Sequence, residues 1–531
     1  MAASVSSRRA LLRAGSVGTG TALLTALPAT AEAARGPRKK SGKSRPKRGK
    51  ARKRTASSAA TLHALSRFSY GWTPDLAREV TKARSFERWF DRQVTGGYPD
   101  TFYETSATWW PSVNAAPEEI WARDKAGVET MWDADANYQR WVLARRIHSR
   151  RQVLEVMTEL WENHLHVPAR GEGAALFRAA YGKAVRSHAL GKYAELLRVA
   201  VTHPAMGVHL DNAVSTKRAP NENLGRELLE LFTLGAGHYS EADVRDSARI
   251  LTGLRVDTWK TWRVWYDPES HATGPVSVAG FTHANGSADG QPVLRAYLDH
   301  LARHPQTART VARRIAVRFV SDEPSERLVA KLARVYLDSD TAVVPVLRAL
   351  IADQEFAASR GAKVRTAPDD LVATYRALRV QLRRPTGPEA AANAILWQAG
   401  DLGTYPFAWP RPDGLPDHAA AWSSTSRFLA SLRVHLNLAG GWWPKQDVKH
   451  RPHRAWVPLS RKRRSIRFDE LVDHLSEELL GRSAPRSLVR AACQATGLKQ
   501  RSRIDKDHAL VKWQMPHLLT VFLDSPFHLT R

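Results

Sequence analysis

The chain has 531 residues, of which 43% are hydrophobic, and a formal net charge of +28. A chain of this length can bury one large core or two packed lobes. Its sole cysteine, Cys493, excludes an intramolecular disulfide, so the folded state must be stabilised by packing.

The first 33 residues have the pattern of a twin-arginine signal peptide, with residues 1–33 removed on export. Arg8 and Arg9 precede a moderately apolar run, and an A-x-A cleavage site follows at residues 31–33. We therefore expect an extracellular, cell-wall or periplasmic location. The apolar run is shorter than the roughly 20 residues that cross a bilayer, and no later segment is apolar for that length. We expect no transmembrane span in the mature chain.

A basic linker follows the signal peptide and occupies residues 34–56. Residues 35–54 contain twelve lysines or arginines and no acidic residue, a composition that predicts disorder. In an exported protein, such a segment suits an anionic wall polymer or a membrane surface. A solvated spacer explains the composition equally well. The export signal argues against nucleic acid as a partner.

Residues 57–440 are predominantly helical in pattern. Apolar side chains recur at helical spacing across residues 136–166, which predicts one or two long helices. One later segment departs from helix, because the run from Trp262 to Tyr266 alternates with the period of a strand. The sequence therefore predicts a mainly α fold, a large multi-helix globular body with a small β-hairpin insertion near residues 258–290.

Two helix starts lie close together in residues 220–253. The motif Pro-Asn-Glu-Asn places proline in a first helical turn and puts acceptors and negative charge at the positive end of the helix dipole. An apolar face follows at i, i+4 and i+7, formed by Leu224, Leu228 and Leu231. Ser240 then begins S-E-A-D, a capping box that predicts a second helix.

This stretch resembles the signature of a bacterial family. The residues that carry the resemblance read PNEN-x-x-REL-LELFTLG-x-GHY, followed by S-E-x-DV-R-x-x-AR-x-LTG. Other segments follow in the expected order, among them HALSRFSYGWTP, LWENHLHV, HLDN and FAWPRPDGLPDHAAAW. The family is domain of unknown function (DUF) 1800. The resemblance covers roughly residues 61–440, and a weaker resemblance continues to the C-terminus.

The resemblance to the DUF 1800 family implies a large, mainly helical, exported protein without an established reaction. His164 and His271 match histidines of the family pattern. Members are often encoded beside a second exported family that is similar to alkaline-phosphatase-like sulfatases, which implies an exported sulfatase-like partner protein. After residue 440 the chain changes to a basic linker and an amphipathic helix over residues 468–480. We expect residues 441–531 to form a C-terminal helical extension packed on the same body.

No strong catalytic motif is present in the sequence, which lacks a G-x-S-x-G elbow, a Walker loop and an H-E-x-x-H pair. A polar constellation remains, whose carboxylate, amide and imidazole groups could hold a divalent metal that activates water. The other interpretation is a structural network in which neighbouring arginines pair with the acids. The candidates are His164, Asp211, Asn212, Asn223, Glu227, Glu230, His238, Asp243 and His271.

These observations favour an exported cell-envelope protein that acts as a binding or assembly factor, with help from its basic arm. The alternative is a metal-dependent hydrolase that acts on an envelope or extracellular substrate, with a site at the acids of residues 211–230 and His164. A nucleic-acid binding protein ranks third because of the export signal. The sequence does not identify the ligand, the metal or the oligomeric state.

Overall fold

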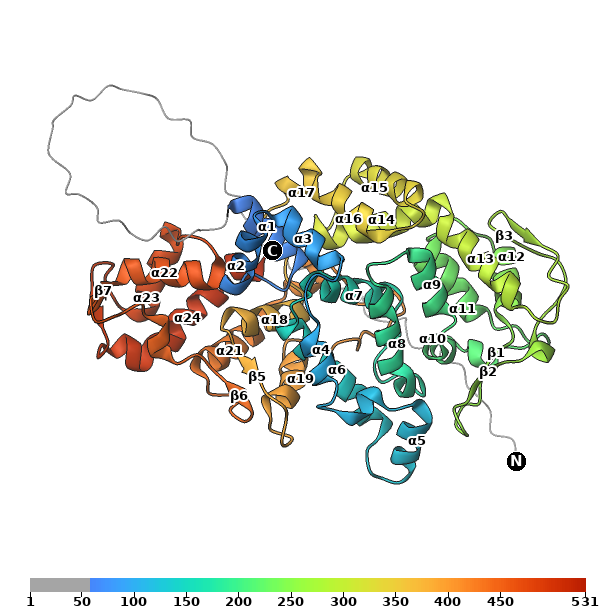
Figure 1. Ribbon diagram of the computed structural model, residues 1–531, viewed down its shortest axis with the longest axis horizontal. Helices are drawn as coiled ribbons and strands as arrows, with labels where there is room; N and C mark the ends of the chain where they lie inside the picture. The colour runs from blue at the N-terminus through green and yellow to red at the C-terminus, as the bar shows by residue number, and fades with distance from the viewer. Residues whose placement is uncertain (1–57) are drawn as a thin grey trace, which may run out of the picture. The chain divides into compact units, whose positions relative to one another are not determined.

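The computed structural model describes residues 58–531, and the predicted signal peptide and basic linker lie outside the described residues. Most of the described chain is helical, and each of its sheets is a single antiparallel pair of strands (Figure 1). The mainly α fold class is therefore confirmed. None of the helices in residues 58–531 is long and apolar enough to span a membrane.

Five helices open the described part of the chain, and hydroxyl side chains cap the first three. Ser58, Thr73 and Ser85 each accept a hydrogen bond from an amide in the following turn, which satisfies a donor that has no partner inside the helix. The five helices are α1 (Ala59–Phe68), α2 (Pro74–Ala83), α3 (Phe86–Val94), α4 (Thr101–Ser106) and α5 (Pro117–Lys125).

Helix α7 (Gln152–His164) lies at the centre of the fold and contacts α1, α3, α6, α8 and α14 (Figure 1). Twelve of its 13 residues are buried, so its charged side chains must find their partners inside the protein. The neighbouring helices are α6 (Met131–His148), α8 (Ala174–His188), α9 (Tyr193–Val201), α10 (Pro204–His209) and α14 (Pro305–Phe319).

Three glutamates form a stripe along α7 at i, i+4 and i+7, and arginines from other helices neutralise each of them. At the first position, Glu155 Oε1 lies 2.8 Å from Arg186 Nη2 of α8. At the third, Glu162 Oε1 lies 2.9 Å from Arg178 Nη2 of α8 and accepts a 2.7 Å hydrogen bond from the Tyr138 hydroxyl of α6. All five side chains are buried.

The middle glutamate, Glu159, connects α7 to two further helices. Its Oε1 lies 2.8 Å from Arg146 Nη1 of α6, and its Oε2 lies 2.7 Å from Arg318 Nη2 of α14. Arg318 also contacts Asp369, at 3.2 Å, and Asp417, at 3.4 Å. Burial disfavours the charge on Arg318, but Asp369 and Glu159 raise its pKa well above the usual value. The network thus runs from the centre of the fold to the start of α18 (Ala367–Ala377).

The segment with two predicted helix starts contains α11 (Glu222–Glu227), a π-helical turn over residues 228–233, and α12 (Glu241–Leu251). The predicted capping box of α12 is present. The wider π turn buries Leu229 and Phe232, while Leu231 is only half-buried. The predicted apolar face is therefore present, since Leu224 and Leu228 are buried and Leu231, partly buried, packs against the same core.

The predicted β insertion is present as two short antiparallel hairpins that follow α12. Trp262, in the turn of the first hairpin, is fully buried and packs edge-on against Phe177. The strands are β1 (Leu254–Val256), β2 (Val264–Tyr266), β3 (Val276–Val278) and β4 (Phe281–His283).

The second half of the chain is a series of helices with two further strand pairs. Contacts between α18 and α22, and between α21 and α24, join residues 441–531 to the preceding helices. The remaining helices are α13 (Gln291–Arg303), α15 (Glu326–Asp338), α16 (Val343–Ile351), α17 (Gln354–Ala358), α19 (Ala391–Asp401), α20 (Ala419–Trp422), α21 (Thr425–Gly440), α22 (Phe468–Leu480), α23 (Arg486–Thr496), α24 (Met515–Leu523) and α25 (Pro526–Leu529). The strand pairs are β5 (Gln381–Leu382) with β6 (Val448–Lys449), and β7 (Ser465–Arg467) with β8 (Arg503–Asp505).

Short helical turns complete the secondary structure of the described residues. The 3₁₀ turns are η1 (Pro111–Asn114), η2 (Asn212–Val214), η4 (Pro268–Ser270) and η5 (His453–Trp456), and a second π turn, η6 (Leu510–Gln514), precedes α24.

Gly182 of α8 lies where a larger residue has no room. A Cβ atom there would overlap the Tyr138 hydroxyl and lie 2.5 Å from Glu162 Oε1. Alanine has the higher helix propensity, by about 1 kcal/mol. We nevertheless expect Gly182→Ala to lower the free energy of unfolding by about 1–3 kcal/mol, because overpacking displaces Tyr138 from its carboxylate acceptor. Urea denaturation measures the difference.

Gly207→Ala in α10 is the matched control, since a Cβ atom there would meet its nearest neighbour at an ordinary 3.8 Å. We expect this variant to be at least as stable as the wild type. Equal stability of Gly182→Ala and the wild type would contradict the packing around Glu162.

Candidate functional site

A cavity of about 700 Å³ lies between the first helix and the C-terminal helices of the described chain. Its lining comes from α1, residues 360–365, α18, the end of α22 and α25. Figure 1 shows α1 beside the C-terminus, although the two are far apart in the sequence. The cavity therefore forms only when α1 packs against the C-terminal helices.

The polar part of the lining is cationic. Four arginines and two histidines line the cavity, and no lining residue within the described range is acidic. The rest of the lining is largely apolar and includes Trp72, Leu480 and Phe527. Such a cavity suits a ligand that carries negative charge beside an apolar group. The cationic residues are Arg360, Arg365, Arg482 and Arg531, and the two histidines, His63 and His528, have pKa values lowered by burial to about 4 and about 3.

The four arginines differ in how far they are already engaged. Arg365 Nε donates a 2.7 Å hydrogen bond to the His528 carbonyl, and Arg531 lies 3.0 Å from the Asp369 carboxylate. Arg360 and Arg482 are exposed and make no hydrogen bond or ion pair with any residue in 58–531. Their guanidinium groups are therefore available to an anion.

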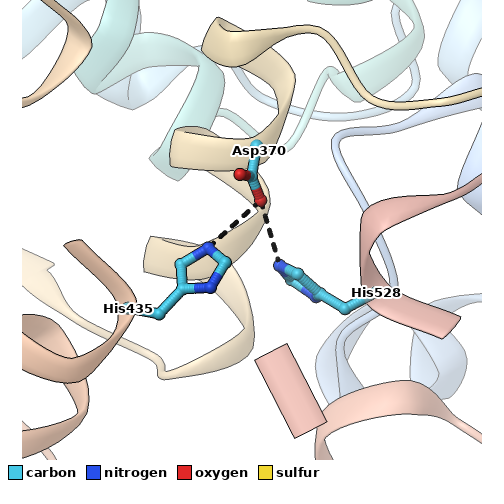
Figure 2. A group of neighbouring side chains, drawn as sticks. All are labelled: Asp370, His435 and His528. Atoms are coloured by element: carbon cyan, nitrogen blue, oxygen red, sulfur yellow. Dashed lines mark hydrogen bonds and ion pairs between the residues drawn. The ribbon is translucent and has the colours of Figure 1, made fainter. Parts of the chain in front are cut away.

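Asp370, His435 and His528 meet at the wall of this cavity (Figure 2). Asp370 Oδ1 lies 3.2 Å from His435 Nε2 and 3.6 Å from His528 Nε2. All three side chains are buried, and His528 contributes to the cavity lining. The Thr374 hydroxyl lies 3.1 Å from His528 Nε2.

Two helices fix the position of the Asp370 carboxylate. Thr366 caps α18, so Asp370 lies in the first turn, where the helix dipole stabilises negative charge. Asp370 Oδ2 accepts hydrogen bonds from Arg427 Nη2 at 3.1 Å and from the Ser431 hydroxyl at 2.8 Å. Arg427, Ser431 and His435 occupy successive turns of α21, at i, i+4 and i+8, so one face of this helix surrounds the carboxylate.

Opposing environments separate the protonation states of the two histidines. His435 Nδ1 lies 2.6 Å from Asp524 Oδ1. Burial lowers the pKa of His435, but Asp370 and Asp524 outweigh burial and raise this pKa to about 9. Burial and the nearby Arg365 lower the pKa of His528 to about 3, although Asp370 opposes the shift. At neutral pH, without a bound cation, His435 is charged and His528 is neutral.

The Asp370 carboxylate stays ionised in this setting. Burial alone would raise its pKa, but His435 and Arg427 hold the pKa well below its usual range. One carboxylate and two imidazoles are also the usual ligand types of zinc. This is the single cluster of three or more His, Cys, Asp or Glu donors at metal-binding separation in residues 58–531.

The acids predicted as a site lie along α11 and its π turn. Asn223 Nδ2 donates a 3.4 Å hydrogen bond to Asp211 Oδ2, so these two candidates are brought together. Glu230 accepts a hydrogen bond from the Tyr239 hydroxyl. Glu227 accepts none from the described residues, and burial together with the Glu230 charge raises its pKa.

Three other candidates are buried and hydrogen-bonded. His164 Nε2 lies 2.9 Å from the Tyr193 hydroxyl, and burial lowers the pKa of His164 to about 3. His271 Nε2 lies 3.0 Å from Asn285 Oδ1. The Asn212 amide donates a 3.1 Å hydrogen bond to a backbone carbonyl at the end of α12.

The last two candidates lie near the surface. His238 is exposed and lies 2.6 Å from the Gln306 amide nitrogen. Asp243 belongs to the capping box with Ser240 and accepts a 2.8 Å hydrogen bond from the Ala279 amide. No three of the predicted His, Asp and Glu candidates come within metal-binding distance of one another in the described chain.

The cluster at the cavity wall was not predicted from the sequence, although one signal was present. Arg427, Ser431 and His435 form a polar stripe at i, i+4 and i+8 of one helix, and a stripe of this kind needs a partner wherever the helix buries it. The partner, Asp370, and the third member, His528, come from distant segments without a spacing that links them.

The fold and the cavity define a mainly helical protein with an interior carboxylate–arginine network and a cationic cavity. Residues 63–529 match the sequence profile of the family described as "Protein of unknown function (DUF1800)". The chain belongs to this family. No curated protein and no solved structure matches the chain.

Glu227 provides a test through the pH dependence of stability. Because the pKa of Glu227 is raised in the folded state, its stabilising contribution is complete below the unfolded pKa of about 4.3 and is lost as the pH rises through the folded pKa. Glu227→Gln cannot ionise, so the variant does not lose stability as the pH rises. We expect the variant to melt above the wild type at neutral pH, with a difference that shrinks in acid.

Glu241→Gln should melt below the wild type at neutral pH, because Arg226 lowers the pKa of Glu241 and the variant loses this ion pair. Thermal unfolding of both variants at several pH values measures the two effects. A lower melting temperature for Glu227→Gln at neutral pH would mean that the Glu227 charge is engaged in a stabilising contact.

Proposed function

We propose that this protein is an exported cell-envelope factor that binds an anionic group attached to an apolar moiety in the cavity between α1, α18, α22 and α25. The observation that carries the proposal is the lining, which combines arginines and histidines with an apolar surface and has no acidic residue within 58–531. A volume of about 700 Å³ is in the range of small-molecule sites.

The state of the arginines supports an anionic ligand. Arg365 is held by a backbone carbonyl, and the charge of Arg531 is balanced by the buried Asp369 and Asp417 carboxylates, so these two arginines are already engaged. Arg360 and Arg482 can donate to a ligand without first breaking an ion pair. Charge-assisted hydrogen bonds from arginine to phosphate or carboxylate are about twice as strong as neutral ones.

The apolar lining determines what the anionic group is attached to. Trp72, Leu480 and Phe527 lie on the cavity surface, and Arg482 stacks on Phe527 at 4.4 Å from the ring centre. Contact with a small hydrophilic anion would leave this apolar surface exposed to water. An amphiphile with a phosphate or carboxylate head would cover both parts of the lining.

The twin-arginine motif and the basic arm support an activity at the cell surface. Arg8 and Arg9 with the following apolar run support a twin-arginine route, which carries folded proteins and suits a chain with one cysteine. Residues 35–54, with twelve basic residues and no acid, would hold the body near an anionic wall polymer or membrane surface. The arm and the cavity then select for the same sign of charge.

The binding proposal is tested by titrating the mature protein with octyl phosphate in a calorimeter, with octyl glucoside as the neutral comparison. We expect octyl phosphate to bind and octyl glucoside to bind much more weakly. Arg360→Gln combined with Arg482→Gln should weaken octyl phosphate binding at least tenfold, or about 1.4 kcal/mol. Two charge-assisted donors are lost from the cavity in this variant.

Arg486→Gln combined with Arg490→Gln is the matched control, because both arginines are exposed on α23 and neither lines the cavity. This control removes the same charge and should leave affinity nearly unchanged. An equal loss in both double variants would mean that only the overall charge matters. No loss in the cavity variant would contradict the assignment of the site.

The export proposal makes a separate prediction about the precursor. Changing Arg8 and Arg9 to Lys keeps the charge but removes the paired arginines that the twin-arginine route reads. We expect the uncleaved precursor of this variant to remain in the cytoplasm, as measured by cell fractionation and immunoblotting. Normal export of the variant would contradict the assigned route.

A further inference from the structure

We propose that Asp370, His435 and His528 form a binding site for a divalent cation of the zinc type in the wall of the cavity. The site lies away from the residues predicted from the sequence as metal ligands. It is also distinct from the exposed arginines that the proposed function uses, and it does not depend on them.

Two of the three separations between the donor atoms are close to those that zinc requires. Zinc bonds of about 2.0–2.1 Å in a tetrahedral arrangement place neighbouring donors about 3.3–3.4 Å apart. Asp370 Oδ1 lies 3.2 Å from His435 Nε2 and 3.6 Å from His528 Nε2, and the three donors lie within 4.8 Å of one another. The two oxygen-to-nitrogen separations are thus near those of a zinc site, and side-chain adjustment would bring both imidazoles to ligand distance of one ion.

The surroundings of the ligands are those of a supported metal site. His435 uses Nδ1 to contact the Asp524 carboxylate at 2.6 Å, which leaves Nε2 directed toward Asp370. A carboxylate behind a metal-binding histidine fixes the ring and raises its basicity. The second oxygen of Asp370 is held by Arg427 and Ser431, so the carboxylate cannot turn away from the cluster.

His528 distinguishes a metal site from a purely structural ion-pair network. Asp370 and Asp524 already satisfy both nitrogens of His435, so the network is complete without a second histidine. His528 Nε2 lies 3.6 Å from Asp370, beyond hydrogen-bond distance, yet it points at the same oxygen (Figure 2). The Thr374 hydroxyl, at 3.1 Å, is the hydrogen-bond partner of His528 Nε2, and a cation shared by the three donors would replace this contact.

The test is a titration of chelator-treated mature protein with Zn²⁺, followed by metal analysis after gel filtration. Co²⁺ serves as a second probe, because its visible absorption reports tetrahedral coordination. We expect each chain to retain one ion, with a higher melting temperature because the ion binds the folded state. His528→Gln should lower the affinity for Zn²⁺ at least tenfold, since a glutamine amide keeps the contact with Thr374 but is a poor zinc ligand.

His203→Asn is the control. His203 is half-buried, and its Nδ1 caps α10 at 3.2 Å, a contact that an Asn side chain can replace. This variant should retain wild-type affinity. Asp370→Asn should also lose the ion; if that variant fails to fold, His528→Gln still decides the question, since no ion pair of the network needs a charged His528.

Two results would overturn the inference. One is wild-type protein that retains neither Zn²⁺ nor Co²⁺, and the other is His528→Gln with unchanged affinity for both ions. The titration uses no anionic ligand, so zinc uptake and octyl phosphate binding succeed or fail independently.

Discussion

The burial of charge on α7 is the constraint on which the rest of the structure depends. Glu155, Glu159 and Glu162 have no access to water, and an unpaired buried carboxylate costs several kcal/mol. Each glutamate is neutralised only when arginines of other helices arrive at hydrogen-bond distance. The helices around α7 must therefore assemble in one arrangement, because an alternative packing would leave both an acid and a guanidinium buried without a partner.

The same network positions the cavity. Arg318 joins the centre of the fold to Asp369 in the first turn of α18, and Asp369 also holds Arg531 at the cavity wall. The next residue, Asp370, turns to His435 and its neighbours instead. The two adjacent carboxylates therefore have different partners. Asp369 completes the interior network, and Asp370 forms the cluster at the cavity wall. The fold and the candidate site are linked through a single helix start.

The sequence predicts the local features of this fold better than the site. The capping box at Ser240 and the β insertion follow from neighbouring residues, and both are present. The π turn after Leu228, which also buries Leu229 and Phe232, was not predicted because local periodicity does not show it. Asp370, His435 and His528 come together only after distant helices pack, and packing was not inferable from spacing. The acids of α11 were predicted as a candidate site because they occur together in one short sequence motif.

Diffraction from crystals of the mature protein soaked with Zn²⁺ and octyl phosphate would locate both ligands in one experiment. We expect anomalous density at the zinc edge among the donor atoms of Asp370, His435 and His528. We also expect phosphate density within hydrogen-bond distance of Arg360 and Arg482. Zinc density only at other residues, or octyl phosphate bound away from this cavity, would contradict the two assigned sites.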